Sequence, residues 1–284
     1  MPAPTVTVDL FGDAACPWDF SAEGARMRLL WRYGAHLEWR RHMVVLSRDR
    51  DEYAARGIAL ADLAAGRAKL RDLFGMPIDV SPAPRHMATV VACRAVVGVR
   101  RHAPEREDAF LRYLRVHSMS GRLLLDEPDT LRVAAGDAGL DGDQVLAWAG
   151  EPATEELLRE DMALARRPGT IALAMPERLA RTPGGGWRYT CPSYVFRRGD
   201  RVLEAPGFQP ARVLEVCVAN LAPELEARPD PAGVEEVLAW APYPLATAEV
   251  AVLLEAPLAA AARMLEAAGA RRHPAAHDAY WSAA

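Results

Sequence analysis

The sequence predicts an α/β fold, and three observations support that prediction. The chain opens with a strand, a helix and a second strand within residues 5–46. Residues 51–167 then carry apolar side chains at helical spacing, without a strand signal. Strand-like segments return at residues 187–204. Strands on both sides of a long helical region favour an α/β class over an all-helical one.

The opening segment sets the position of the most reactive side chain. Residues 5–11 (TVTVDLF) are rich in β-branched residues and are expected to form a strand that ends at Gly12 and Asp13. Residues 21–34 have helical periodicity, and residues 37–46 are expected to form the second strand. Cys16 therefore lies where the first strand turns into the first helix.

The middle of the chain is expected to be helical. Six segments there carry apolar residues three and four positions apart: residues 59–75, 88–102, 107–119, 129–140, 141–150 and 153–167. Later, residues 187–196 are strand-like on both sides of Pro192, and residues 201–204 form a short return strand after a turn. A helix is expected at residues 211–221, before a Pro- and Asp-rich linker.

The last fifty or so residues are expected to form a separate module of three helices, at residues 234–241, 246–256 and 257–270. The second and third of these resemble a helix-turn-helix. A DNA-reading helix needs Arg, Asn or Gln at its start, whereas residues 257–263 (PLAAAAR) are mostly apolar. We therefore expect no nucleic-acid partner. The module is expected to pack on the first domain, to pair two copies in a homodimer or to cap a substrate cleft.

Composition narrows the class of protein further. The 284 residues are 51% hydrophobic and 25% charged, with a net charge of −4, which is typical of a globular protein and excludes disorder or a coiled coil as a description of the whole chain. Lys69 is the only lysine, so arginine supplies all the other bases. The start of the chain lacks a signal-peptide pattern, and no apolar run is long enough to span a membrane. We expect a cytoplasmic protein without a membrane partner.

The cysteines and histidines give no sign of a disulfide framework or a metal site. The four cysteines, Cys16, Cys93, Cys191 and Cys217, are sparse and widely spaced. Cys93 and Cys217 lie in apolar helical segments and are expected in the core. A metal-binding His273–His277 pair is disfavoured, because Pro274 would break a helix there and no third ligand is evident.

The sharpest feature is the tetrapeptide Cys16-Pro17-Trp18-Asp19 at the start of a helix. Free backbone N–H groups and the helix dipole at such a position stabilise a thiolate over a thiol. A thiolate is the reacting form both in disulfide exchange and in attack on carbon electrophiles.

The sequence resembles the DsbA-like branch of the thioredoxin superfamily, which includes FrnE-type oxidoreductases, hydroxychromene-carboxylate isomerases and kappa-class glutathione transferases. The resemblance rests on the strand followed by D-A-A-C-P-W, on the long helical stretch, and on Thr190-Cys191-Pro192-Ser193 at a strand entry. It covers roughly residues 5–222 and implies a thioredoxin-fold domain at residues 1–50 and 170–226, interrupted by a helical insertion at residues 51–169. The separate C-terminal module then spans residues 230–284. The resemblance also implies that Cys16 is the nucleophile and Pro192 the cis-proline.

One departure from the family pattern concerns the fourth motif position, where dithiol members carry cysteine and this chain has Asp19. A carboxylate there disfavours the thiolate of Cys16. Alternatively, Asp19 is a base or orienting group for a bound thiol, or simply an acid in the first helical turn. Cys191 is a candidate second thiol if it lies within disulfide range of Cys16; otherwise it is a small buried residue lining the pocket.

Further candidate contacts surround this site. Pro17 and Trp18 are expected to line the mouth of the pocket, and the backbone of Pro192 and Ser193 to hold a partner in an extended conformation. His86 is a candidate acid, base or ligand contact, or else an exposed residue near a helix start. Tyr194 is expected to be a sheet residue.

Function is expected to centre on the Cys16 thiol. The first hypothesis is a monothiol oxidoreductase or transferase that forms mixed disulfides with a small thiol or a protein thiol, with no covalently bound cofactor. The second is an isomerase or glutathione-transferase-like enzyme in which a bound low-molecular-weight thiol does the chemistry. The third is a non-catalytic adaptor on a thioredoxin scaffold.

Overall fold

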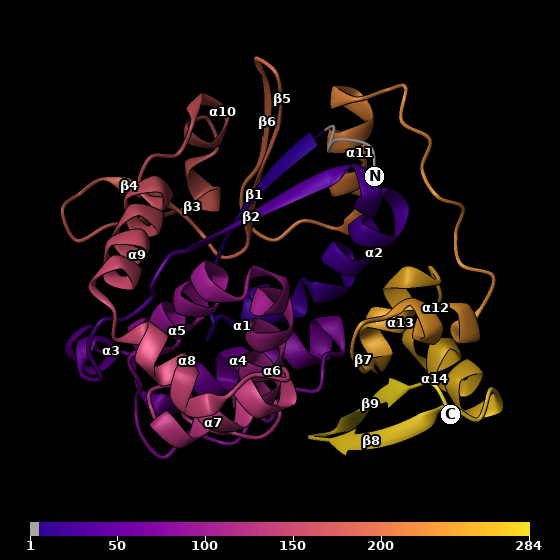
Figure 1. Ribbon diagram of the computed structural model, residues 1–284, viewed down its shortest axis with the longest axis horizontal. Coiled ribbons are helices and arrows are strands. Elements are labelled where there is room, and N and C mark those ends of the chain that lie inside the picture. Colours follow the sequence, from indigo (N-terminus) through magenta and orange to yellow (C-terminus); the bar gives the residue numbers. More distant parts are fainter. Residues whose placement is uncertain (1–5) are drawn as a thin grey trace.

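The computed structural model describes residues 6–284 (Figure 1). Thr5 of the expected first strand, and residues 1–5 of the expected first domain, lie outside the described residues. A four-stranded sheet has the order β2-β1-β5-β6. Its strands are β1 (Val6–Gly12), β2 (Leu37–Met43), β5 (Ser193–Arg198) and β6 (Arg201–Ala205). β1 and β2 are parallel, whereas β5 is antiparallel to both β1 and β6. This is the expected α/β architecture.

The two faces of this sheet are buried against different layers. Val6, Val8 and Leu10 pack on α2 (Glu23–Tyr33) and α11 (Ala211–Leu221). The alternate residue Phe11 points to the opposite face, as the two-residue period of a strand requires. That face is covered by α9 (Pro152–Ala165), by α10 (Thr170–Leu173) and by a short ribbon of β3 (Leu179–Arg181) and β4 (Trp187–Tyr189).

The helical insertion follows β2, as expected, and it has its own core. Its helices are α3 (Glu52–Ala55), α4 (Leu60–Phe74), α5 (Thr89–His102), α6 (Glu107–Met119), α7 (Pro128–Asp137), α8 (Gly142–Ala149) and α9. Small and β-branched residues of α5, such as Ala92, Val96 and Val99, are fully buried at its centre. α1 (Pro17–Ser21) lies between this insertion and the sheet domain (Figure 1).

The C-terminal module departs from the three-helix prediction. The three helices are present as α12 (Val234–Trp240), α13 (Thr247–Leu253) and α14 (Leu258–Ala267). They are joined by a second sheet of order β7-β9-β8, with β7 (Leu245–Ala246), β8 (Arg271–Ala275) and β9 (Asp278–Ser282). The order helix, strand, helix, helix, strand, strand is that of a winged helix-turn-helix. His273 lies in β8 and His277 in the hairpin turn, so no helix carries the pair.

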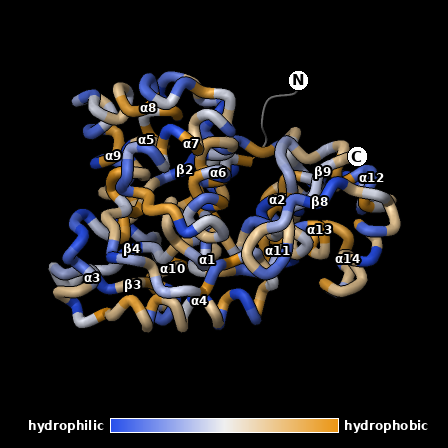
Figure 2. The backbone as a smooth tube through the Cα atoms, turned by 90° about the horizontal axis from the view of Figure 1, so that it is seen from below, coloured by the Kyte–Doolittle hydropathy of each residue, from blue (hydrophilic) through white to orange (hydrophobic). Residues whose placement is uncertain are grey.

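The module packs on the sheet domain through α2. Met27 and Trp31 of α2 share a buried cluster with Leu245, Val250 and other residues of the module. At Gly24, an added Cβ would lie 3.1 Å from the side chain of Val252, so the two helices approach closely. Figure 2 shows the module as a lobe beside α2 and α11. Within residues 6–284, no helix is both long enough and apolar enough to cross a membrane.

Candidate functional site

Cys16 lies at the junction of β1 and α1, as the sequence predicted. It is the N-cap residue of α1, in an extended conformation, and Pro17 occupies the first helical turn. Proline suits this position because its missing N–H would have no helical acceptor there. The Cys16 carbonyl accepts a hydrogen bond from the Phe20 N–H at 3.0 Å, which starts the helix. Only 5% of Cys16 is exposed, so a partner must reach its thiol through a pocket.

Cys191 and Pro192 face Cys16 from the start of β5. The Cys16 Sγ lies 3.5 Å from the carbonyl oxygen of Cys191, to which it can donate. The peptide bond between Cys191 and Pro192 is cis, the geometry that the family resemblance implies for Pro192. A hydrogen bond with the Cys16 side chain, together with burial, raises the pKa of Cys191, so its thiol is protonated at neutral pH. The fold thus brings the Cys16 thiol into contact with Cys191, which lies 175 residues away in sequence.

An open pocket of about 390 Å³ gives access to both cysteines. Its walls include Pro17, Trp18, Leu46, Arg178 and Arg188. Trp18 is 42% exposed, and its ring contacts Phe74 and Phe208 edge-on, at centroid distances of 5.9 and 6.0 Å. Pro17 and Trp18 therefore line the same pocket as Cys16 and Cys191.

Asp13 organises the loop that carries Cys16, a role that sequence reasoning missed. Its carboxylate is fully buried. One oxygen accepts from the Ala15 N–H, and the other from the Leu46 N–H and the Thr89 hydroxyl, all at 2.8 Å. Asp13 thereby ties the loop to the end of β2 and the start of α5. An Asp that accepts from the N–H two residues ahead is a recognised turn signal, and it could have been read from the sequence.

Asp19 is buried and faces away from solvent. Its Oδ2 accepts from the Asp13 N–H at 3.1 Å and forms an ion pair with Arg115 of α6. Burial raises the pKa of Asp19, and the charge of Arg115 opposes that shift. A Cβ at Gly12 would overlap this same oxygen, so the position requires glycine. The Asp19 carboxylate is thus bound by Arg115 and by a backbone N–H.

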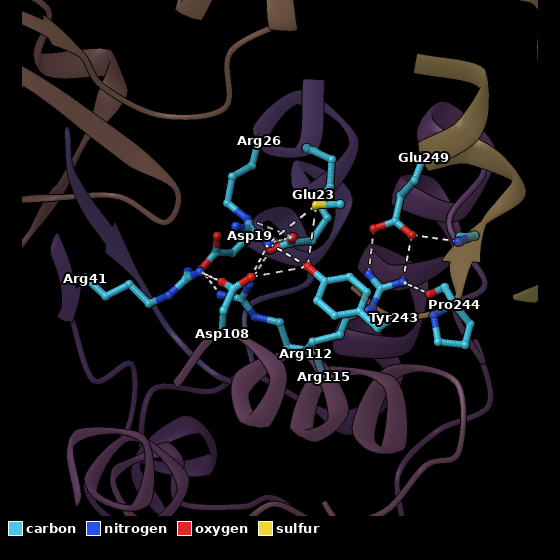
Figure 3. Close-up of polar contacts among 12 residues, drawn as sticks. Asp19, Glu23, Arg26, Arg41, Asp108, Arg112, Arg115, Tyr243, Pro244 and Glu249 are labelled. Carbon is cyan, nitrogen blue, oxygen red and sulfur yellow. Dashed lines mark hydrogen bonds and ion pairs between the residues drawn. The ribbon is translucent and has the colours of Figure 1, made fainter. Parts of the chain in front are cut away.

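Arg115 joins Asp19 to a buried chain of charges, drawn in Figure 3. Its guanidinium also binds Glu23 at 2.8 Å, and Glu23 binds Arg26 at 2.8 Å. Arg26 in turn contacts Asp108 at 3.1 Å. The charges of Asp19 and Glu23 outweigh burial and raise the pKa of Arg115. Cations and carboxylates therefore alternate beneath the Cys16 helix.

Two sequence candidates, Ser193 and His86, are not among the residues that line the thiol pocket. The Ser193 hydroxyl is buried, donates to the Thr190 carbonyl at 2.7 Å and accepts from the Gly207 N–H at 2.9 Å, so it holds neighbouring loops and leaves only its backbone for a partner. His86 lies in a neighbouring cavity, which reaches the Cys16 loop at Ala15. Its ring stacks on Tyr53 at a centroid distance of 6.1 Å.

The remaining candidates behave mostly as core residues. Cys93 and Tyr194 are buried in the insertion core and the sheet core, as predicted. Cys217 is only half-buried at the edge of the sheet core, where burial raises its pKa to about 11. Within residues 6–284, no three His, Cys, Asp or Glu side chains are grouped to hold a metal ion.

A protein-family model matches more than half of the chain. The profile of the DSBA-like thioredoxin domain matches residues 7–170. No curated protein sequence matches the chain.

Several solved structures are similar to it. A candidate protein disulfide isomerase from Nitrosomonas europaea has a TM-score of 0.61 at 15% identity, over 78% of this chain and 98% of that one. A probable DsbA oxidoreductase from Streptomyces coelicolor has a TM-score of 0.57 at 19% identity, over 79% and 93% of the two chains. The cytosolic disulfide reductase DsbM from Pseudomonas aeruginosa has a TM-score of 0.53 at 16% identity, over 74% and 97%.

Proposed function

Since this chain belongs to the DSBA-like thioredoxin domain family, we propose that it is a thiol–disulfide oxidoreductase whose nucleophile is Cys16. One observation carries the proposal: the Cys16 thiol contacts Cys191 beside cis-Pro192, at the base of an open pocket. A thiol in an accessible pocket with a second thiol beside it has the parts that disulfide exchange needs. The C-P-W-D site itself supplies one thiol, so the first product is a mixed disulfide on Cys16.

We propose that the exchange proceeds in two steps. The Cys16 thiolate attacks one sulfur of a substrate disulfide, a new S–S bond forms, and the other substrate sulfur leaves as a thiolate. The thiolate released in the first step takes the proton of Cys191, and the Cys191 sulfur then attacks Cys16 Sγ and releases the second substrate sulfur. The substrate disulfide is reduced to two thiols, while Cys16 and Cys191 are oxidised to a disulfide. Because the pKa of Cys191 is raised, Cys191 stays protonated in the resting protein and Cys16 reacts first.

A small thiol is the proposed partner. DsbM from Pseudomonas aeruginosa has a solved structure with GSH, with a TM-score of 0.52 to this chain at 17% identity. We extend that ligand class, a low-molecular-weight thiol, to this protein. We also propose the cytoplasm as its compartment, because a reducing compartment preserves free thiols such as the four cysteines here.

Trapping of the mixed disulfide tests the proposal. Reduced protein is exposed to bis(2-hydroxyethyl) disulfide, quenched in acid and mapped by peptide mass spectrometry. Wild type is expected to show a Cys16 adduct that resolves into a Cys16–Cys191 disulfide. Cys191→Ser should accumulate the adduct on Cys16, because no second thiol resolves it. Cys16→Ser should give neither product, whereas Cys217→Ser, the matched control, should behave as wild type.

The opposite outcome identifies a competing hypothesis. If Cys16 stays unmodified while Cys217 reacts, then the oxidoreductase proposal is wrong. The protein would then be a thiol-cofactor enzyme or an adaptor. If Cys191→Ser fails to accumulate the adduct, Cys16 still acts as the nucleophile but Cys191 is not its resolving partner.

A further inference from the structure

A second groove, of about 680 Å³, lies next to the thiol pocket and is lined by arginines from three parts of the fold. Its arginines are Arg48, Arg56, Arg166, Arg181 and Arg188, with Glu52 as the one acidic residue in the lining. They come from the segment around α3, from the end of α9 and from the β3–β4 ribbon. In Figure 1 these elements lie along the same side of the molecule, with α9 between α3 and the ribbon.

Neutral groups hold these arginines in place. The guanidinium of Arg166 donates to the Met162 carbonyl at 2.7 Å, and that of Arg188 to the Tyr189 carbonyl at 2.8 Å. Arg181 donates to the Gly185 carbonyl at 3.2 Å and lies over the Trp187 ring, 3.8 Å from its centre.

The other two arginines follow the same pattern. Arg48 contacts the Met162 sulfur at 3.9 Å, and Arg56 lies 5.7 Å from the centre of the Tyr53 ring. All of these contacts are with neutral groups, so none of them neutralises the charge of an arginine.

The groove is unusual for this protein because most of its arginines pair with carboxylates, as Arg28, Arg112 and Arg115 do. Within residues 6–284, none of the five groove arginines forms an ion pair with Asp or Glu; the nearest acid, Glu52, accepts from the backbone N–H of Arg48 instead. Burial and the charges of Arg48 and Arg188 lower the pKa of Arg166, and the charge of Glu52 only partly opposes this shift, as expected where like charges lie close together. A bound anion would relieve that repulsion.

The groove borders the thiol pocket, since Leu46 and Arg188 line both. Guanidinium groups are planar donors that match phosphate and carboxylate oxygens in pairs. We propose that this arginine groove binds the anionic end of the substrate, which is a low-molecular-weight thiol or disulfide carrying phosphate groups or several carboxylates. This inference rests on the proposed function and names its substrate class.

The exchange chemistry is unchanged by this assignment. The anionic end of the substrate lies among the arginines, and its sulfur end passes Leu46, which lines both cavities, to reach Cys16. The Cys16 thiolate forms an S–S bond with one sulfur, the substrate S–S bond breaks, and the departing thiolate carries the electron pair away. Binding energy from the charged end positions the disulfide for attack.

Equilibrium binding tests the groove without relying on the chemistry. Cys16→Ser protein is titrated with pyrophosphate and, separately, with citrate by calorimetry, so that the two arms separate phosphate from carboxylate recognition. At least one is expected to bind, with an affinity that falls as salt rises. The double variant Arg48→Gln/Arg166→Gln should lose at least about tenfold in affinity, because loss of even one charge-assisted hydrogen bond has an effect of that size. Arg263→Gln/Arg271→Gln, which alters exposed arginines of the C-terminal module, should bind as before. Absence of binding by both anions would overturn the proposal.

Exchange rates distinguish failure of this inference from failure of the proposed function. Coenzyme A disulfide, which carries phosphates, is compared with neutral bis(2-hydroxyethyl) disulfide as substrate for Cys16. The charged disulfide is expected to react faster, and the ratio of the two rates should drop in Arg48→Gln/Arg166→Gln but not in the control variant. If both disulfides react at equal rates in wild type, the inference is wrong and the proposed function stands. If neither modifies Cys16, the proposed function is wrong, and the pyrophosphate and citrate titrations alone decide whether the groove binds anions.

Discussion

The two aspartates that flank Cys16 act through the scaffold around the thiol. Asp13 is satisfied by backbone N–H groups and the Thr89 hydroxyl, and Asp19 by Arg115 and a backbone N–H. The sequence suggested that a carboxylate at position 19 would act on the neighbouring thiolate. The structure places a guanidinium on that carboxylate, so the pair brings little net charge to the thiol.

Arg115 pairs with both Asp19 and Glu23, so its removal should lower the stability of the fold. Arg115→Met leaves Asp19 without its counter-ion and Glu23 with only Arg26, and both carboxylates are buried. The free energy of unfolding is expected to fall by about 3–5 kcal/mol, measured by chemical denaturation. Adding Asp19→Asn to this variant should recover part of the loss, because a neutral amide costs less to bury than a lone carboxylate.

The matched control for this substitution is Arg159→Met. Arg159 pairs with Glu156 on the surface, where both side chains are more than half exposed, so its removal should cost well under about 1 kcal/mol. If Arg115→Met is as mild as Arg159→Met, the buried pair does not support the Cys16 helix.

At the scale of single residues, the sequence located the Cys16 motif in the fold but not the side chains that contact it. Cys16, Pro17 and Trp18 could be placed because a strand end and a helix start are visible in local periodicity. Arg115 could not be placed, because it lies 96 residues after Asp19 and nothing local connects the two. The arginine groove was missed for the same reason, since it is assembled from three separate segments.

At the scale of elements, His42 connects the sheet to the helical insertion. Its ring lies between Asp9 of β1, at 3.0 Å, and Asp161 of α9, at 3.1 Å. Burial opposes its charge, but the hydrogen bonds to the two aspartates outweigh burial and raise the pKa of His42 to about 9. The protonated ring therefore holds β1, β2 and α9 together at neutral pH.

This contact predicts how stability depends on pH. A group whose pKa is raised on folding stabilises the protein fully below its unfolded pKa of about 6.5. That contribution, about 3 kcal/mol at most, is lost as the pH rises through about 9. Denaturation at intervals from pH 6 to pH 10 should show wild type losing stability relative to His42→Gln, which lacks the titrating ring. Parallel curves for the two proteins would contradict the assignment.

The elements missed by the sequence analysis are short strands and short helices. Within the β8–β9 hairpin, Arg271 and Arg272 are exposed, and burial begins only at Ala279 and continues through Tyr280 and Trp281. Three consecutive buried residues do not show the two-residue period of a half-buried strand. The long amphipathic helices were predicted closely, because each buries one face and exposes the other.

At the scale of the whole molecule, a buried ion pair and a buried hydrogen bond join the C-terminal module to both other units. Arg112 of α6 donates to Glu249 of α13 at 2.6 and 2.7 Å, and Glu249 also accepts from the Ala246 N–H at 2.6 Å. The Tyr243 hydroxyl accepts from Arg26 of α2 at 2.7 Å. Figure 3 shows these groups beside the chain that leads to Asp19. The module therefore stabilises the helices beneath the thiol site.

Loss of the ion pair between Arg112 and Glu249 should destabilise both helices that it joins, α6 and α13. Glu249→Gln removes a fully buried carboxylate and leaves Arg112 as a buried cation without a counter-ion. We expect the free energy of unfolding to fall by about 3–5 kcal/mol, and hydrogen exchange to speed up in α6 as well as in α13. Glu266→Gln is the matched control: Glu266 is exposed on α14 of the same module, and its substitution should change neither quantity by much. Faster exchange in α13 alone, with α6 still protected, would mean that the module unfolds as an independent unit and does not support the thiol site.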